Sequence, residues 1–129
     1  MSDIFKVEII TPDQIVFKSD VKEVIIPSYE GQMGILKDHI PLITFLKPGI
    51  IVIKNQEEKK YYIEEGTVEF SDNNLLILTS KVEDINNLAK SYITNLQEEA
   101  EKKLKDHNSS DKEKYIAFHK IETLKEINR

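Results

Sequence analysis

The chain has 129 residues, a mass of 15.0 kDa and a formal net charge of −5 at pH 7. Its 40% hydrophobic and 32% charged residues are typical of a globular protein of one or two small domains. The acidic balance argues against nucleic acid as a partner, because a phosphate backbone requires a basic surface. The absence of cysteine excludes disulfide scaffolds, thiolate zinc sites and cysteine nucleophiles.

The N-terminal sequence has none of the features of a targeting signal. Apolar and polar residues alternate over residues 4–8, without a basic region before an apolar stretch and without the arginines of a transit peptide. The longest apolar runs, at residues 50–53 and 75–78, are far shorter than the roughly 20 residues that span a bilayer. We therefore expect a soluble chain that is not exported by a signal of its own.

The first part of the chain has the pattern of short strands separated by turns. All four glycines and all four prolines lie within residues 1–66, where they mark turns. Phe5, Val7 and Ile9 alternate with polar residues. Further strand-like runs are bounded by turn signals and occur at residues 21–26, 50–53, 61–63 and 75–78. This pattern predicts an all-β sandwich or barrel.

The periodicity changes after Val82, where helical patterns replace strands. Apolar residues recur every three or four positions from Ile85 to Leu104, which predicts an amphipathic helix. Glu83 and Asp84 precede it, where acidic residues favour a helix N-terminus. We therefore expect residues 1–82 to form a β-sandwich domain and residues 83–129 a separate helical element.

A second helix is predicted near the C-terminus. Ser110 and Glu113 have the spacing of a capping box, in which the serine and the glutamate each bond the other's backbone N–H. Four apolar residues form the following stripe: Tyr115, Phe118, Ile121 and Leu124. Two helices joined by a short polar loop form an antiparallel hairpin, whose stripes can pack on each other, on the sandwich or on a partner.

The residue types that carry catalysis are sparse. The histidines, His39, His107 and His119, lack the spacing of a metal motif such as His-Glu-x-x-His. Residues 31–34, Gly-Gln-Met-Gly, lack the Lys-Ser/Thr that ends a phosphate-binding loop, so these glycines indicate a tight turn. We therefore expect no catalytic residues, no metal and no cofactor.

Four segments are not explained by turn chemistry alone. They are residues 11–13 (Thr-Pro-Asp), 27–36 (Pro-Ser-Tyr-Glu-Gly-Gln-Met-Gly-Ile-Leu), 39–42 (His-Ile-Pro-Leu) and 46–49 (Leu-Lys-Pro-Gly). In this order and spacing they resemble the epsilon subunit family of bacterial ATP synthase, which is homologous to the mitochondrial delta subunit. Residues 65–70 resemble that family's Gly-Gly-x-x-Glu-Val strand, with Glu65 in place of the first glycine. A helical hairpin follows in the family as well, so the resemblance covers essentially the whole chain.

The resemblance implies a flattened β-sandwich followed by a C-terminal αα-hairpin, in a non-catalytic subunit of the rotating central stalk. It implies that the sandwich binds the gamma subunit and rests on the c-ring, which helps to couple proton flow to ATP synthesis. In bacterial members the hairpin can extend along gamma toward the catalytic alpha and beta subunits and restrain ATP hydrolysis. It also implies a peripheral location on the cytoplasmic face of the bacterial inner membrane.

The same resemblance suggests two groups of contact residues. The c-ring-facing end of the sandwich comprises Glu30, Gly31, Gln32, Met33, Gly34 and His39. Gln32 replaces an acid of some relatives, which weakens a charge-based contact there, and the glycines with His39 serve equally well as residues that order the loop. The hairpin contacts with the catalytic subunits comprise Lys112, Lys114, Tyr115, Phe118, Lys120, Ile121 and Leu124.

Nucleotide binding departs from the family pattern. Some bacterial epsilon subunits bind ATP through an Ile/Leu-Asp-x-x-Arg-Ala motif, which corresponds here to residues 85–90. Ile85 fits the motif, but Asn86 replaces its aspartate and Ala89 its arginine. Arg129 is the first arginine of the chain, so the planar guanidinium that binds phosphate is missing. We therefore expect weak or absent ATP binding.

Two other functions are consistent with the residues alone. A free-standing adaptor of the same architecture would bind another protein and would not purify with gamma. A nucleotide-sensing module would bind ATP in a calorimetric titration. An enzyme is a weaker alternative, because the sequence contains no recognisable triad, metal cluster or cofactor loop.

Overall fold

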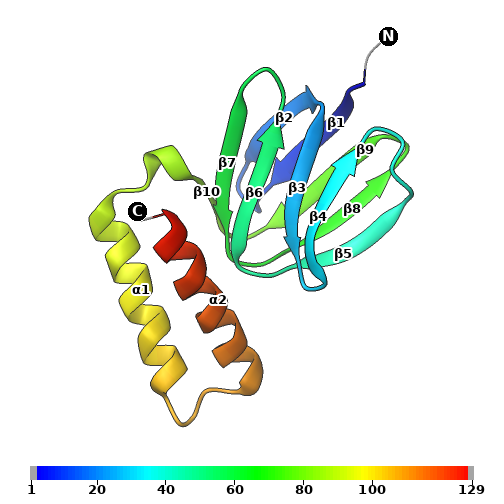
Figure 1. The fold of residues 1–129 in the computed structure, drawn as a ribbon. Helices are drawn as coiled ribbons and strands as arrows, with labels where there is room; N and C mark the ends of the chain where they lie inside the picture. The colour runs from blue at the N-terminus through cyan, green and yellow to red at the C-terminus, as the bar shows by residue number, and fades with distance from the viewer. Residues whose placement is uncertain (1–2, 128–129) are drawn as a thin grey trace.

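Alternating apolar residues in the first part of the chain form a β-sandwich, and two helices follow it (Figure 1). The structure is a computed structural model that describes residues 3–127. The strands are β1 (Phe5–Ile10), β2 (Ile15–Val21), β3 (Glu23–Ser28), β4 (Gly31–Leu36), β5 (Leu42–Leu46), β6 (Gly49–Lys54), β7 (Glu58–Ile63), β8 (Gly66–Ser71), β9 (Asn74–Thr79) and β10 (Val82–Asp84). The predicted fold class, a β-sandwich followed by a two-helix hairpin, is confirmed.

The sandwich arises from one sheet that folds over on itself. Its strand order is β10-β7-β6-β3-β5-β8-β9-β1-β2, and β4 pairs with β3 outside this path. Strands β3 and β5 pair only at Ser28 and Leu46, and there the sheet passes from one layer to the other. One layer contains β10, β7, β6, β3 and β4, and the other contains β5, β8, β9, β1 and β2 (Figure 1).

Side chains from the inner faces of both layers form the main core. Phe5 packs against Phe70 in an edge-to-face arrangement, with ring centroids 5.7 Å apart. Gly49 is required where β6 starts, because a Cβ on it would lie 2.6 Å from the Cβ of Pro27. The other buried members of this core are Val7, Ile9, Val21, Val24, Ile26, Ile35, Leu46, Ile51, Ile53, Tyr61, Ile63, Val68, Leu75 and Ile77.

The first α-helix begins later than the sequence predicts. Val82–Asp84 form β10, which pairs with β7, and Ile85–Asn87 form a short 3₁₀ turn called η1. The carboxylate of Asp84 accepts a hydrogen bond of 2.9 Å from the backbone N–H of Asn86 and so caps η1 rather than α1. Helix α1 spans Lys90–Lys105. The expected helical stripe from Ile85 is therefore wrong at its start, because Ile85 belongs to η1 and Leu88 and Ala89 precede the first residue of α1.

Helix α2 (Asp111–Ile127) packs against α1 through a face different from the predicted stripe. Ile121 and Leu124 are buried as expected, but Tyr115 is 39% exposed and Phe118 is 49% exposed. Ala117, Ile121 and Leu124 are spaced i, i+4 and i+7, so they form the buried face. Tyr115 and Phe118 lie off that face, which explains why two positions of the predicted stripe are wrong.

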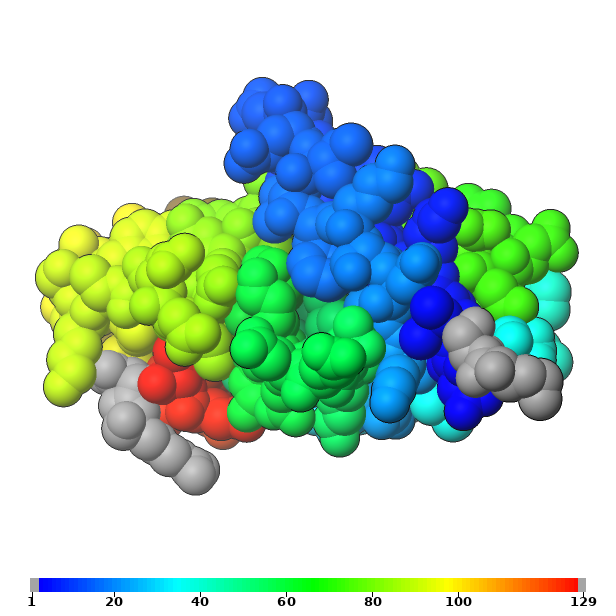
Figure 2. Space-filling view, turned by 90° about the horizontal axis from the view of Figure 1, so that it is seen from above, coloured from blue at the N-terminus to red at the C-terminus, as the bar shows by residue number. Residues whose placement is uncertain are grey.

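The hairpin lies beside the sandwich rather than over one of its layers (Figures 1 and 2). Tyr62 of β7 joins the two parts, because its fully buried side chain packs with Ile93 and Leu96 of α1 and Leu124 of α2. Among the described residues, no helix has the length and apolar character needed to cross a membrane.

Candidate functional site

The turn between β3 and β4 is held in one conformation by a buried serine. The Ser28 hydroxyl donates a hydrogen bond of 2.7 Å to the carbonyl of Gly31 and accepts one of 3.2 Å from the N–H of Glu30. Gly31 has a φ of 119°, a backbone conformation that residues other than glycine rarely adopt. Tyr29 and Glu30, which we call the β3–β4 tip, are therefore presented at a fixed position with Glu30 exposed.

The remaining predicted c-ring residues do not all lie at this tip. Gln32, Met33 and Gly34 follow along β4, with Met33 partly buried against the core. His39 follows the far end of β4, and its ring meets Phe70 at 5.9 Å. A strand of this length spans about 20 Å. The expectation that His39 shares one end of the sandwich with Glu30 is therefore wrong, whereas contact with a ring stays a prediction.

The loop that carries His39 is ordered by two residues that the sequence analysis missed. The N–H of Asp38 donates to Asn73 Oδ1 at 2.6 Å, and Asn73 Nδ2 donates back to Asp38 Oδ1 at 2.9 Å. Both residues have positive φ, which aspartate and asparagine tolerate better than most residues. These two hydrogen bonds attach the β4–β5 loop to the β8–β9 turn.

The outer face of the layer that contains β5 presents exposed apolar side chains, and the strand register places Glu69 and Glu8 beside Leu76 on the same face. Ile43 and Phe45 of β5 are 76% and 61% exposed. Strand register brings side chains of β1, β8 and β9 onto the same face, because Phe45 pairs with Thr67, Thr67 with Leu78, and Leu78 with Ile10. We call this surface the apolar face, and its apolar residues are Ile10, Ile43, Phe45, Leu76 and Leu78. Strands with apolar residues on both sides, such as residues 75–78, were the available sequence signal.

A polar network also attaches the hairpin to the sandwich. Tyr62 Oη donates a hydrogen bond of 3.0 Å to Glu64 Oε2, and Lys120 Nζ of α2 lies 3.3 Å from the same oxygen. The Lys120 and Glu64 side chains are only 17% and 20% exposed, so solvent screens this ion pair less than a surface pair. Burial, followed by the negative charge of Glu64, raises the pKa of Tyr62 well above its ordinary value.

The predicted hairpin contacts therefore fall into two groups. Lys120 is paired with Glu64, and Ile121 and Leu124 are buried, so these three serve the docked hairpin. Lys112 and Phe118 are exposed and Lys114 is partly exposed. Tyr115 stacks on Tyr29 of the β3–β4 tip, with ring centroids 5.7 Å apart and planes 17° apart. In the docked state only the exposed residues are available to another subunit.

The positions that match the degenerate ATP motif lie in η1 and directly before α1. Ile85 and Asn86 belong to η1, and Ala89 is the N-cap of α1 without a side-chain hydrogen bond. Within residues 3–127, no three His, Cys, Asp or Glu side chains are grouped as metal ligands. These positions therefore form a connection between β10 and α1.

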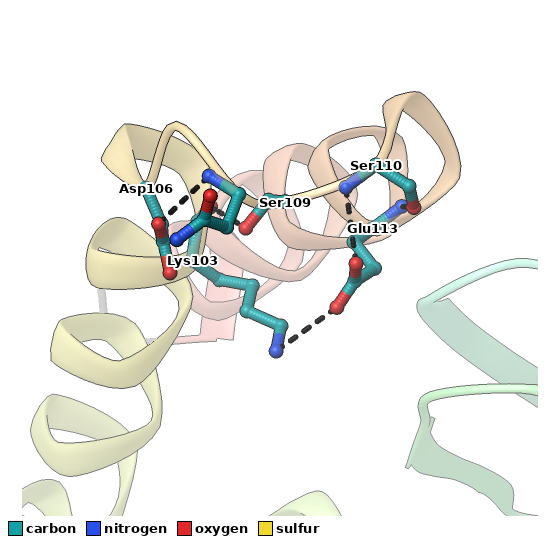
Figure 3. Close-up of polar contacts among 6 residues, drawn as sticks. Lys103, Asp106, Ser109, Ser110 and Glu113 are labelled. Carbon is teal, nitrogen blue, oxygen red and sulfur yellow. Dashed lines mark hydrogen bonds and ion pairs between the residues drawn. The ribbon is translucent and has the colours of Figure 1, made fainter.

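The turn between the helices contains the predicted capping box, which is confirmed (Figure 3). The N–H of Ser110 donates to Glu113 Oε1 at 3.0 Å, and the N–H of Glu113 donates to Ser110 Oγ at 3.1 Å. Lys103 Nζ of α1 lies 3.0 Å from the second oxygen of Glu113. The backbone hydrogen bond from Ser110, followed by Lys103, lowers the pKa of Glu113 to about 2.

Acid is expected to weaken the hairpin through Glu113. Because the pKa of Glu113 is lowered in the folded chain, its stabilisation is complete above the unfolded pKa of about 4.3 and is lost as pH falls toward 2. The variant Glu113→Gln should therefore be less stable than wild type at pH 7, and the two should converge near pH 2. Urea unfolding followed by circular dichroism across this range measures the difference, and a pH-independent difference would contradict it.

Exposed apolar side chains on the outer face of a sheet are typical of proteins that form interfaces, and comparisons with known proteins identify the family. The model of the ATP synthase delta/epsilon chain β-sandwich domain matches residues 4–85. The chain is 47% identical to an ATP synthase epsilon chain of Pelagibacter ubique (strain HTCC1062), covering 99% of this chain and 100% of that one. It is 34% identical to one of Dichelobacter nodosus, covering 81% and 75%. The chain therefore belongs to the ATP synthase delta/epsilon family, as its motifs predicted.

A solved structure has the same fold. The Euglena gracilis mitochondrial ATP synthase, described as OSCP/F1/c-ring in rotational state 1, contains a chain with a TM-score of 0.76 and 19% identity. That match covers 97% of this chain and 79% of the other. The family membership confirms the prediction of a non-catalytic, epsilon-type chain that belongs to a peripheral, membrane-associated complex.

Proposed function

We propose that this chain acts in the central stalk of a proton-translocating ATP synthase, where it connects the c-ring to the catalytic core through gamma. The observation that carries this proposal is the apolar face in a chain of the delta/epsilon family. Apolar patches that remain exposed on a folded chain mark protein interfaces. In the assembled enzyme, this chain lies at the cytoplasmic face of the bacterial inner membrane.

The apolar face is the contact for gamma. Phe45 and Ile43 are its most exposed apolar residues and project from β5 at its edge, and aromatic side chains supply much of the binding energy in protein interfaces. The hairpin packs on the other layer, at Tyr62 of β7. The chain can therefore bind gamma while the hairpin remains docked.

The β3–β4 tip is the contact for the c-ring. Glu30 is exposed there, and the Ser28 hydrogen bonds fix the turn before a partner arrives. A preformed turn lowers the ordering cost of binding. The tip adjoins the apolar face, because the N–H of Tyr29 donates a hydrogen bond of 3.3 Å to the carbonyl of Phe45, so the ring and gamma bind as neighbours.

The hairpin restrains ATP hydrolysis when it leaves the sandwich and reaches the alpha and beta subunits. Lys112, Lys114 and Phe118 are its available contacts in the docked state. Extension also releases Lys120 from Glu64 and exposes Ile121 and Leu124, which must be buried again on gamma. A hairpin with two burial partners forms a two-state element whose populations depend on its partners.

Reconstitution tests this function directly. Cognate enzyme that lacks this chain is reconstituted into vesicles and titrated with the full chain, and ATP hydrolysis and ATP-driven proton pumping are measured together. We expect the chain to raise the number of protons pumped per ATP hydrolysed and to slow hydrolysis. A chain that binds with no effect on pumping would contradict the coupling role, and failure to bind would contradict the stalk position.

Nucleotide does not control the hairpin in this chain. Asn86 and Ala89 replace the charged motif positions, and the docked hairpin is held by the chain's own groups. Calorimetry with ATP should give no binding at millimolar concentration, and ATP should leave the thermal midpoint unchanged. A saturable heat or a rise in the midpoint would contradict this prediction and favour nucleotide sensing.

A further inference from the structure

One aromatic contact joins the β3–β4 tip to the hairpin. Tyr29 precedes Glu30 in the tip, and its ring stacks on Tyr115 in the first half of α2. Each tyrosine is 39% exposed, so both rings are partly shielded and neither is fully buried. The turn between β3 and β4 lies at the lower end of these strands in Figure 1, toward the side of the sandwich where α2 packs.

Both rings are carried by segments that are themselves fixed. The Ser28 hydroxyl bonds hold the backbone on either side of Tyr29. Further along α2, Lys120 pairs with Glu64, and the Thr123 hydroxyl, which donates to the carbonyl of His119 at 2.7 Å, lies 3.4 Å from the carbonyl of Pro48. The stack therefore depends on α2 being docked and on the tip keeping its turn conformation.

We infer that the Tyr29–Tyr115 stack links occupancy of the tip to docking of the hairpin. A partner bound at Glu30 favours the docked hairpin, and a docked hairpin strengthens binding at the tip. The inference rests on the proposed function in that the c-ring is the partner of the tip. The linkage is reciprocal because each event alters the equilibrium of the other by the same factor.

The sign of the linkage follows from the geometry. Stacking on Tyr115 restricts Tyr29 beside Glu30, so less freedom is lost when a partner binds the tip. Glu30 itself is exposed and does not depend on Tyr115 for access. From the strength of aromatic pairs, the docked hairpin should tighten binding at the tip by about 2- to 10-fold.

The test measures hairpin docking and ring binding in the same full-length chain. The chain has no cysteine, so Gln56→Cys in the β6–β7 turn and Lys102→Cys in α1 allow two spin labels at exposed positions. Double electron–electron resonance then gives the docked fraction, with and without the detergent-solubilised c-ring of the cognate enzyme. Binding of the c-ring to each unlabelled variant is measured separately.

We expect Tyr115→Ala to lower the docked fraction and to weaken c-ring binding by about 2- to 10-fold. In Tyr115→Ala, binding of the c-ring should no longer raise the docked fraction. Tyr115→Phe keeps the stacking ring and should behave as wild type. Phe118→Ala is the matched control, because it removes an exposed aromatic ring of the same helix that packs on His119, whereas the ring stacked on Tyr29 is that of Tyr115.

The outcomes separate the inference from the proposed function. If the ring binds Tyr115→Ala as tightly as wild type, or raises its docked fraction equally, the linkage is refuted and the ring contact stands. A ring that lowers the docked fraction of wild type refutes the sign and therefore the inference. If the c-ring binds neither wild type nor Tyr115→Ala, both the linkage and the proposed contact of the tip with the c-ring are refuted. The variant Tyr29→Leu breaks the stack from the other side and must reproduce the loss of linkage.

Discussion

Replacing Tyr62 with alanine is expected to lower the free energy of unfolding by about 3–5 kcal/mol and to release the hairpin from the sandwich. The Tyr62 side chain is fully buried and belongs to β7, whereas the residues around it belong to both helices. Removing the ring leaves a cavity that Ile93, Leu96 and Leu124 fill only in part. The same change removes the phenolic donor to Glu64.

Chemical denaturation measures the stability of this variant, and the spin-label distance between sandwich and α1 measures docking. Tyr62→Phe is the matched control, because it keeps the ring and loses only the hydrogen bond to Glu64. Its expected cost is about 1 kcal/mol, since Lys120 still pairs with Glu64. If Tyr62→Ala were no more destabilising than Tyr62→Phe, the ring would not be the main contact between the two parts.

The parts of the fold that local patterns determine could be predicted. Alternation in the first part of the chain predicted strands, and the apolar recurrence from Ile85 onward predicted helices, although the first helix begins only at Lys90. The Ser110–Glu113 box was predictable because its two partners are three residues apart and its hydrogen bonds depend on local backbone geometry.

The start of α1 was not predictable in the same way. Glu83 and Asp84 satisfy the local rule for a helix N-terminus, but pairing with β7 overrides it. The pairing partners are Tyr61 and Tyr62, which lie far away in the sequence. A pattern within a short window does not contain that information.

The same limit explains the candidate contacts. The sequence around Lys120 is typical of a solvated helix face with mixed charges, and only the fold brings Lys120 to Glu64. Tyr115 reads as part of the apolar stripe, and only the fold places it on Tyr29. The apolar face is likewise assembled from β1, β5, β8 and β9, so its extent depends on strand order. Sequence motifs predicted the family, whereas long-range pairing decided which residues remain available to partners.

The second large effect is expected from Phe45→Asp, which should weaken binding to cognate gamma by about 30-fold or more. Phe45 projects from β5, the strand of the apolar face that adjoins the other layer. The substitution removes an aromatic anchor and places a charge where the interface excludes water, which together cost at least about 2 kcal/mol. The folded chain should tolerate the change, because the Phe45 side chain is 61% exposed. Calorimetric titration of gamma with each chain measures the affinity.

Two further variants decide what a loss of binding means. Gln56→Asp adds the same charge in the exposed β6–β7 turn, away from the apolar face, and should bind gamma as wild type does. Glu30→Gln changes only the charge of an exposed side chain at the β3–β4 tip and should also keep its affinity for gamma, because Glu30 is not one of the residues of the apolar face. Weaker binding by both Phe45→Asp and Gln56→Asp, together with tighter binding by Glu30→Gln, would indicate a general electrostatic effect rather than a contact, because the first two add a negative charge and the third removes one. Weakening in Phe45→Asp alone would assign gamma to the apolar face and leave the tip for the ring.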